Sequence, residues 1–200
     1  MILIACAFAA TVTMGFSPSP AFAQTSASEM LEQARARSRE MEELKAVLNG
    51  PDQNMRLAAF DVMVTSGDEA MRQVALDLGL ASADPLMQAM AFKETILSLT
   101  RIVFQLEIDT SQPASVQQKA QQILDSTGSS YTIAVTKPDR ATGVFTVRST
   151  NQGQVNGTNL TFKNGYDTGQ FELVDETTIK GILNINKSGN GVFIATAKIR

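Results

Sequence analysis

The stretch Asn156–Leu173, NGTNLTFKNGYDTGQFEL, decides the fold of the second half of this chain. It contains Asn-Gly pairs at 156–157 and 164–165, and a third pair follows at 190–191. Asn-Gly is the strongest short-range signal for a β-hairpin, because both residues tolerate a positive φ. Between the pairs, apolar residues alternate with polar ones, as on a strand that buries one face. The stretch therefore predicts tight antiparallel hairpins.

The same alternation continues on both sides of this stretch. We predict six or seven strands from Tyr131 onward and one more strand over Thr100–Asp109. A meander of this kind either closes as a small barrel or packs as a sandwich. A short amphipathic helix over Val116–Leu124 is expected to cover an open end or face of it. The inward apolar positions are Tyr131, Ile133, Val135, Phe145, Val147, Leu160, Phe162, Phe171, Leu173, Ile179, Leu183, Ile185, Phe193, Ala195, Ala197 and Ile199.

The first half of the chain has a helical texture. A capping box at Ser26 and Glu29 predicts the start of a helix, and Asn49-Gly50-Pro51 predicts its end, with Gly50 as a left-handed cap. Residues of one stripe recur at alternating steps of four and three, a spacing that two-helix coiled coils also show. Two interpretations follow: a helix that packs on its own domain, or weak self-association through residues 30–48. The stripe consists of Met30, Ala34, Arg37, Met41, Leu44 and Leu48.

A pattern with a period of 32 residues follows this helix. Asp52, Met55, Ala59 and Phe60 recur as Asp84, Met87, Ala91 and Phe92, and Asp84-Pro85 is a strong helix start. Residues 51–98 resemble HEAT-like helical repeats, chiefly in the Asp-x-x-Met-Arg-x-x-Ala run from Asp52. The resemblance implies a helical surface that binds proteins. An ordinary helical bundle is the alternative.

The N-terminus predicts export. Met1–Phe16 is apolar and uncharged, and Ala21-Phe22-Ala23 supplies the small residues of a signal-peptidase site, so we expect cleavage after Ala23. A lipoprotein box ending at Cys6 and a retained anchor are alternatives, and the missing basic residues favour a true start upstream. The processed chain lacks cysteine, which suits the periplasm or another extracellular location for a protein held together by its core alone.

Together these signals predict an α+β protein with two domains. The expected helical domain, HEAT-like or a bundle, covers residues 24–98, and the β-rich domain covers 100–200 with a helix at about 114–126. From Gln24 to Thr100 there are 7 basic and 12 acidic residues, whereas the remainder has 10 basic and 8 acidic. The two halves therefore carry opposite net charges, although attraction between exposed charges is weak.

The residue types that are missing exclude much chemistry. The chain has no histidine and no tryptophan, and its single cysteine is Cys6. Histidine-dependent or cysteine-dependent nucleophilic sites, His- or Cys-ligated zinc, haem, iron–sulfur clusters and disulfides are therefore excluded from the processed chain. No phosphate-binding glycine loop and no cluster of basic and aromatic residues for nucleic acid is present. We assign no catalytic, cofactor-binding or metal-binding residue.

Carboxylates are the remaining candidates for catalysis or for calcium binding. A glycosidase needs two carboxyl groups across a cleft. The strand half offers five, which we interpret as solvated residues of turns and outer faces. The loop Asn164–Thr168 supplies oxygen atoms but lacks the spacing of a known calcium loop. The five carboxylates are Asp139, Asp167, Glu172, Asp175 and Glu176.

The leading functional prediction is an exported, non-enzymatic protein that binds or assembles with another exported or envelope protein through its Met-rich helical surface. The alternative from another class is a carrier of a small apolar ligand, held inside the β part by Phe145, Phe162, Phe171 and Phe193. A carboxylate-based hydrolase, or an inhibitor of one, is the third hypothesis. No cofactor, nucleic acid or membrane partner is expected after processing.

Overall fold

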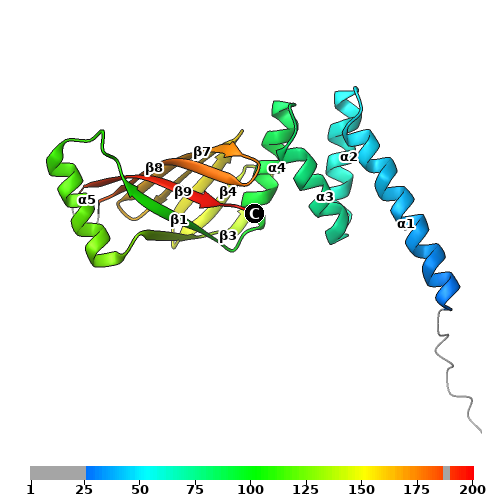
Figure 1. Cartoon of the computed structure of the whole chain (residues 1–200), viewed down its shortest axis with the longest axis horizontal. Helices are drawn as coiled ribbons and strands as arrows, with labels where there is room; N and C mark the ends of the chain where they lie inside the picture. Colours follow the sequence, from blue (N-terminus) through cyan, green and yellow to red (C-terminus); the bar gives the residue numbers. More distant parts are fainter. Residues whose placement is uncertain (1–25, 187–189) are drawn as a thin grey trace, which may run out of the picture. The chain divides into compact units, whose positions relative to one another are not determined.

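The computed structural model describes residues 26–186 and 190–200, so the expected leader and its cleavage site lie outside the described residues. The described chain is α+β, with four helices before a nine-stranded antiparallel sheet and a fifth helix after its first strand (Figure 1). It forms two compact units, which end and begin at Arg39 and Glu40. The compositional change at Thr100 lies inside the second unit, between α4 and β1.

The described part of the first unit is the N-terminal part of helix α1 (Ala27–Leu48), up to Arg39, together with its cap residue Ser26. The capping box is confirmed: the Ser26 backbone N–H donates to Oε2 of Glu29 at 2.8 Å, and the Glu29 N–H donates to Oγ of Ser26 at 3.2 Å. Every residue from 26 to 39 is exposed. This segment therefore gains nothing from burial within its own unit.

In the second unit, α1 ends at Leu48, as the sequence predicts. Leu48 is buried, and Met41, Leu44 and Val47 pack partly buried against the core. The expected left-handed cap at Gly50 is wrong, because Gly50 has no positive φ. The helix ends instead with the Gly50 N–H donating to the carbonyl of Val47 at 3.0 Å.

Three further helices follow: α2 (Gln53–Thr65), α3 (Glu69–Leu80) and α4 (Pro85–Ser98). Each begins at an aspartate whose carboxylate accepts two backbone N–H bonds of the first turn, which satisfies donors that a helix start leaves unpaired. The caps are Asp52, Asp68 and Asp84. The 32-residue pattern is thus a pattern of caps and buried positions.

The two copies of this pattern differ in one position. Phe60 and Phe92 are both fully buried, but Met87 is buried whereas Met55 is more than half exposed. Gly79 allows close packing between the helices, since a Cβ there would lie 2.6 Å from Cβ of Ala91.

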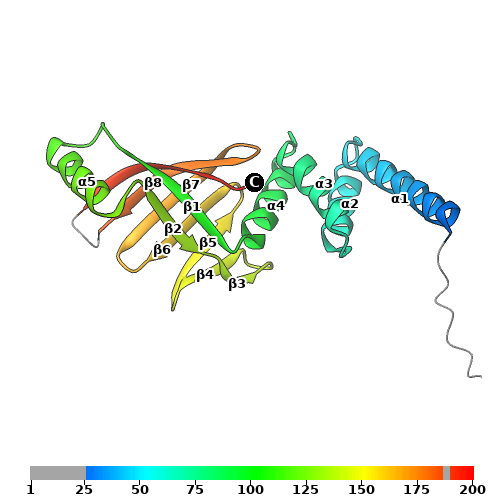
Figure 2. The same cartoon turned by 60° about the horizontal axis from the view of Figure 1, so that its bottom comes forward.

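The sheet has the order β2-β1-β9-β8-β7-β6-β5-β4-β3, with every pair antiparallel. Its two ends, β2 and β3, are consecutive in the chain and meet at Val135, so the sheet is nearly closed and barrel-like (Figure 2). The strands are β1 (Arg101–Ile108), β2 (Ser130–Ala134), β3 (Thr136–Asp139), β4 (Val144–Arg148), β5 (Asn151–Asn156), β6 (Asn159–Asn164), β7 (Asp167–Asp175), β8 (Thr178–Ile185) and β9 (Gly191–Lys198). The predicted strand near Thr100–Asp109 is confirmed as β1.

Two of the three Asn-Gly pairs form two-residue hairpins. In both, asparagine is the last residue of a strand, and only the glycine, Gly157 or Gly165, has a positive φ. A positive φ at the first central residue alone is the pattern of a type II′ turn. Both hairpins therefore form where the Asn-Gly signal places them, and the glycine supplies the positive φ.

Large rings lie over glycines in the interior of the sheet. A Cβ on Gly153 would lie 2.2 Å from the ring of Phe145, and a Cβ on Gly169 would lie 2.5 Å from Phe162 and from Phe171. These glycines leave the space that the rings occupy, so the interior is filled by aromatic side chains packed against backbone.

Two helices pack against different strands of the sheet. Helix α5 (Ala114–Thr127), close to the helix predicted at about 114–126, packs on β9 and β1, while α4 lies beside β3 and β5 (Figures 1 and 2). Gly191 lets α5 approach closely, since a Cβ there would lie 2.6 Å from Cδ1 of Ile123. On the α4 side, Arg140 pairs with Glu94 at 3.3 Å. No described helix has the length and apolar character that a bilayer span requires.

Candidate ligand-binding pocket at the α5 end of the sheet

A cavity of about 590 Å³ opens beside α5 and is called the α5-end pocket below. Its volume lies within the size range of small-molecule sites. Its apolar wall consists of Leu106 of β1, Ile123 of α5 and Ile185 of β8. The polar lining comes from β2 and from the β6–β7 turn. Strands and a helix distant in sequence therefore converge on one space, as the order of the sheet requires.

Tyr131 lines this cavity and belongs to a row of aromatic rings. Its ring stacks on Phe162 with 6.2 Å between centroids, and Phe162 stacks on Phe171, which stacks on Phe104 at 4.3 Å. The phenolic hydroxyl of Tyr131 donates to Oδ2 of Asp167 at 3.0 Å.

Asn164 completes a short polar network with Tyr131 and Asp167. Its Nδ2 donates to the hydroxyl oxygen of Tyr131 at 2.9 Å. The single hydroxyl proton of Tyr131 is donated to Asp167, so the hydroxyl oxygen can only accept from Asn164. If the Asn164 amide were flipped, its Oδ1 would face this oxygen and neither atom would have a proton to donate. In the observed orientation, Oδ1 of Asn164 is left buried without a hydrogen-bond partner. A buried acceptor in this state costs about 1–3 kcal/mol.

Asp167 contradicts the expectation that the carboxylates of the strand half are solvated. Only 7% of it is exposed, and its Oδ1 accepts from the backbone N–H of Asn186 at 2.8 Å. Burial, together with the nearby charge of Asp167, raises the pKa of Tyr131 well above its ordinary value. Tyr131 therefore stays protonated and serves as a hydrogen-bond donor.

The other candidate carboxylates lie in turns or on the outer face, as expected. Asp139 accepts from the N–H of Ala141 and the hydroxyl of Thr142, and Asp175 accepts from Thr177 in the same way. These hydrogen bonds lower the pKa of Asp139 and of Asp175. Glu172 and Glu176 are exposed.

In the loop considered for calcium, residues 164–168, the one carboxylate is already engaged in other contacts. The carboxylate of Asp167 accepts from Tyr131 and Asn186. Within residues 26–186 and 190–200, no three acidic, histidine or cysteine side chains gather where they could hold a metal ion.

Arg148 supplies the positive charge of the cavity. It ends β4, lines the cavity opposite Thr132 of β2, and is exposed. In the described part of the chain, its guanidinium makes no ion pair and no side-chain hydrogen bond. β2 is paired with β1 and not with β4, so the cavity lies where the sheet stays unclosed.

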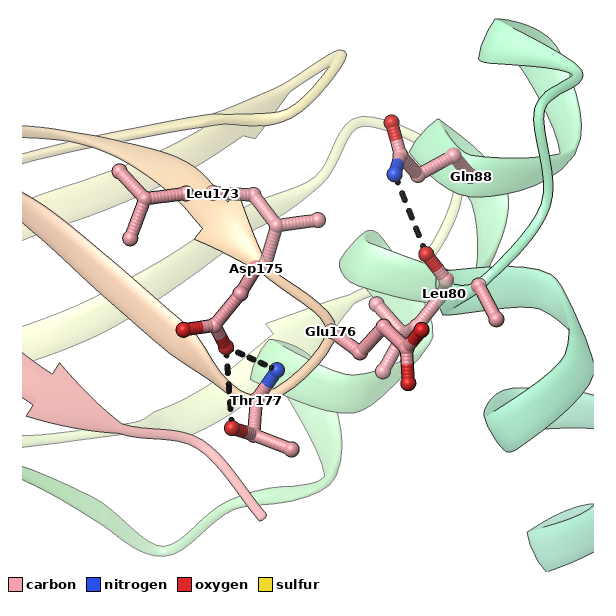
Figure 3. Close-up of a pocket in the computed structure, with 8 residues that line it drawn as sticks. Leu80, Gln88, Leu173, Asp175, Glu176 and Thr177 are labelled. Carbon is pink, nitrogen blue, oxygen red and sulfur yellow. Dashed lines mark hydrogen bonds between the residues drawn. The ribbon is translucent and has the colours of Figure 1, made fainter.

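A second cavity, of about 480 Å³, lies between the β7–β8 turn and the helices (Figure 3). Glu176 points from the turn toward Leu80 and Gln88, and the side chain of Gln88 donates to the carbonyl of Leu80 at 3.1 Å. Asp175 is turned toward its own Thr177. The side chains of Gln88 and Asp175 are thus engaged in local hydrogen bonds, whereas Glu176 makes none with the described residues.

The four phenylalanines proposed from sequence as a ligand cavity are buried side chains, and none of them lines the α5-end pocket. Sequence reasoning missed Tyr131 and Asn164 as pocket residues. Asn164 was noted as part of a hairpin signal and of the loop considered for calcium, and Tyr131 as the start of an alternating run. The proximity of these two residues was not visible in the sequence, because they lie 33 positions apart.

Comparisons with known proteins give no lead: no family model matches the chain, and neither the curated proteins nor the solved structures contain a significant match.

Proposed function

We propose that this protein is a non-enzymatic binding protein that holds a small ligand in the α5-end pocket. The observation that carries the proposal is a cavity of about 590 Å³ with an apolar wall, beside a sheet whose interior is otherwise filled by aromatic side chains. The apolar wall would contribute through burial of the ligand's hydrocarbon surface.

Binding without turnover fits the chemistry of the lining. The processed chain would have no imidazole and no thiol, and the raised pKa of Tyr131 keeps its hydroxyl neutral. Asp167 already accepts hydrogen bonds from Tyr131 and from Asn186, a role that suits positioning. These features support recognition and offer no general base near neutral pH.

The chain lacks tryptophan, so one introduced tryptophan can report on the pocket. Tyr166 lines the cavity and is 79% exposed, which makes Tyr166→Trp a suitable reporter. We expect its emission to change on titration with the neutral probe N-phenyl-naphthylamine. Val103→Trp, on an exposed position of β1, should show no such change.

A blocking variant makes the test specific. Thr127 lines the cavity from α5, whereas its exposed neighbour Ser126 does not. Thr127→Trp should abolish binding of the probe, followed through the probe's own emission, and Ser126→Trp should leave it unchanged. Failure of the probe and of a small-ligand library to bind the folded wild-type chain would overturn the proposal.

A second candidate is the function predicted first from sequence, contact between the helical part and another exported protein. Its support is the exposure of residues 26–39, which includes Met30, 55% exposed, and Leu31. An isolated helix of this length is marginal in water, so a partner would stabilise it. Export itself remains part of this proposal and is tested by N-terminal sequencing of the secreted chain.

A photocrosslinking residue at Leu31, with Val103 as the control position, tests this candidate in the exporting cell. A crosslink to one other protein that Met30→Glu abolishes would support it. A crosslink to a second copy would replace it with self-association through residues 30–48, and no crosslink would contradict both.

A further inference from the structure

We propose that the ligand of the α5-end pocket is a small amphipathic anion. This inference rests on the proposed function and adds the chemical class. The acidic group of the ligand would pair with Arg148, and its apolar body would lie against Leu106, Ile123 and Ile185.

The sign of the ligand's charge follows from the two charged residues that line the pocket, Arg148 and Asp167. Asp167 is buried, and its two oxygens already accept from Tyr131 and from Asn186. Arg148 is exposed at the mouth and has no ion-pair partner in the described part of the chain. The charge that a ligand can reach and neutralise is therefore the positive one.

The position of Arg148 is set by the backbone around it. Arg148 pairs with Asn151 across a two-residue turn, in which Ser149 has a φ of 52°. A non-glycine residue in this conformation is uncommon and is maintained by the surrounding structure. The turn thus ends β4 sharply and leaves the guanidinium at the mouth, where it can form a forked pair with a carboxylate, sulfonate or phosphate group.

The rest of the ligand is defined by the inner part of the pocket. Leu106 and Ile123 are buried side chains whose surfaces face the cavity, so they favour hydrocarbon.

A matched pair of fluorescent probes separates these features. Anilinonaphthalene sulfonate and N-phenyl-naphthylamine share the arene and the N–H donor, and they differ only in the sulfonate. We expect the sulfonate probe to bind the wild type more tightly, by roughly three- to fivefold, the size of an exposed ion pair. The difference should shrink as salt screens the charges.

Three arginine variants complete the experiment. Arg148→Gln should remove the preference for the sulfonate probe and leave binding of the neutral probe unchanged. Arg148→Lys should retain most of the preference for the sulfonate probe. Arg101→Gln, at an exposed and unpaired arginine outside the pocket lining, is the matched control and should behave as wild type.

The outcomes distinguish the two proposals. Equal affinities for the two probes in the wild type, or an Arg148→Gln variant that keeps the preference, would overturn the anionic ligand while leaving a neutral-ligand pocket in place. Binding of neither probe would count against the proposed function itself.

Discussion

The hydroxyl of Tyr131 donates to the carboxylate of Asp167 at 3.0 Å, a hydrogen bond between residues 36 positions apart in the chain. Tyr131 belongs to β2, one end of the sheet order, and Asp167 begins β7, in its middle. The bond therefore connects an edge strand of the barrel-like sheet with its middle strand, and both of its residues line the pocket. It also gives a buried carboxylate a donor, without which its burial would be costly.

Removing the hydroxyl should destabilise the protein. In Tyr131→Phe, Asp167 loses a donor and Nδ2 of Asn164 loses its acceptor, so we expect the free energy of unfolding in urea to fall by about 1–3 kcal/mol. Tyr166→Phe, at an exposed position, is the control and should change it by less than about 0.5 kcal/mol. Equal effects of the two substitutions would contradict the role assigned to this bond.

The raised pKa of Tyr131 predicts a loss of stability in alkali. The folded state keeps the hydroxyl proton at a pH where the unfolded chain, with an ordinary tyrosine pKa near about 10, has lost it. Stability is therefore fully present below that pH, and it declines as the pH rises above it. Tyr131→Phe should lack this component when unfolding is compared at neutral and alkaline pH.

The same shift can be observed directly, because the chain has only two tyrosines. In Tyr166→Phe, the near-ultraviolet tyrosinate absorbance comes from Tyr131 alone. We expect it to appear only well above pH 10 in the folded protein and near about pH 10 after unfolding in urea. Coincident titrations in the two states would rule out the buried environment of this hydroxyl.

Glycine in the sheet interior should not tolerate a methyl group. A Cβ at Gly169 would lie 2.5 Å from both Phe162 and Phe171, so we expect Gly169→Ala to cost about 1–3 kcal/mol in urea unfolding. The double variant Gly169→Ala, Phe162→Leu should recover part of the loss, since leucine vacates the space of the ring. A double variant that loses the sum of the two single effects would contradict packing as the cause.

The Arg56–Asp84 pair should make stability sensitive to acid. Nη2 of Arg56 lies 2.6 Å from Oδ2 of Asp84, and this contact lowers the pKa of Asp84. Its contribution is present above the ordinary aspartate pKa and is lost as pH falls through the lowered value. Asp84→Asn keeps an oxygen that can cap α4, so it should lower Tm at neutral pH and reduce the difference in Tm between neutral and acidic pH. A wild-type acid profile in this variant would contradict the assignment.

Several local features were predictable because their causes lie within a few residues. The capping box of Ser26 and Glu29, the helix start at Asp84-Pro85 and the strand near Thr100–Asp109 follow from neighbouring side chains and from periodicity. The Asn-Gly pairs located two hairpins correctly. Which residue carries the positive φ is decided by the turn that the strand register leaves, and in both hairpins it is the glycine.

The candidate site was less predictable. Asp167 has the surroundings of a turn aspartate in the sequence, between an Asn-Gly pair and Thr168, and yet it is buried. Its burial depends on Tyr131 and Asn186, which the strand order brings to it from other parts of the chain. Arg148 has no ion-pair partner in the described part of the chain, and this indicates a binding role only because Arg148 also lines the pocket.

The sequence by itself therefore determined the secondary elements, the α+β class and the absence of imidazole, since capping, turn formation and alternation depend on adjacent residues. Only the tertiary structure decided that β2 and β3 bring the two ends of the sheet together, that rings fill its interior, and that Tyr131, Asn164 and Asp167 meet at one cavity. The hydrogen bonds of Tyr131 with Asn164 and Asp167 join residues more than 30 positions apart, and strand order and register, which no local pattern encodes, determine which contacts of this kind form.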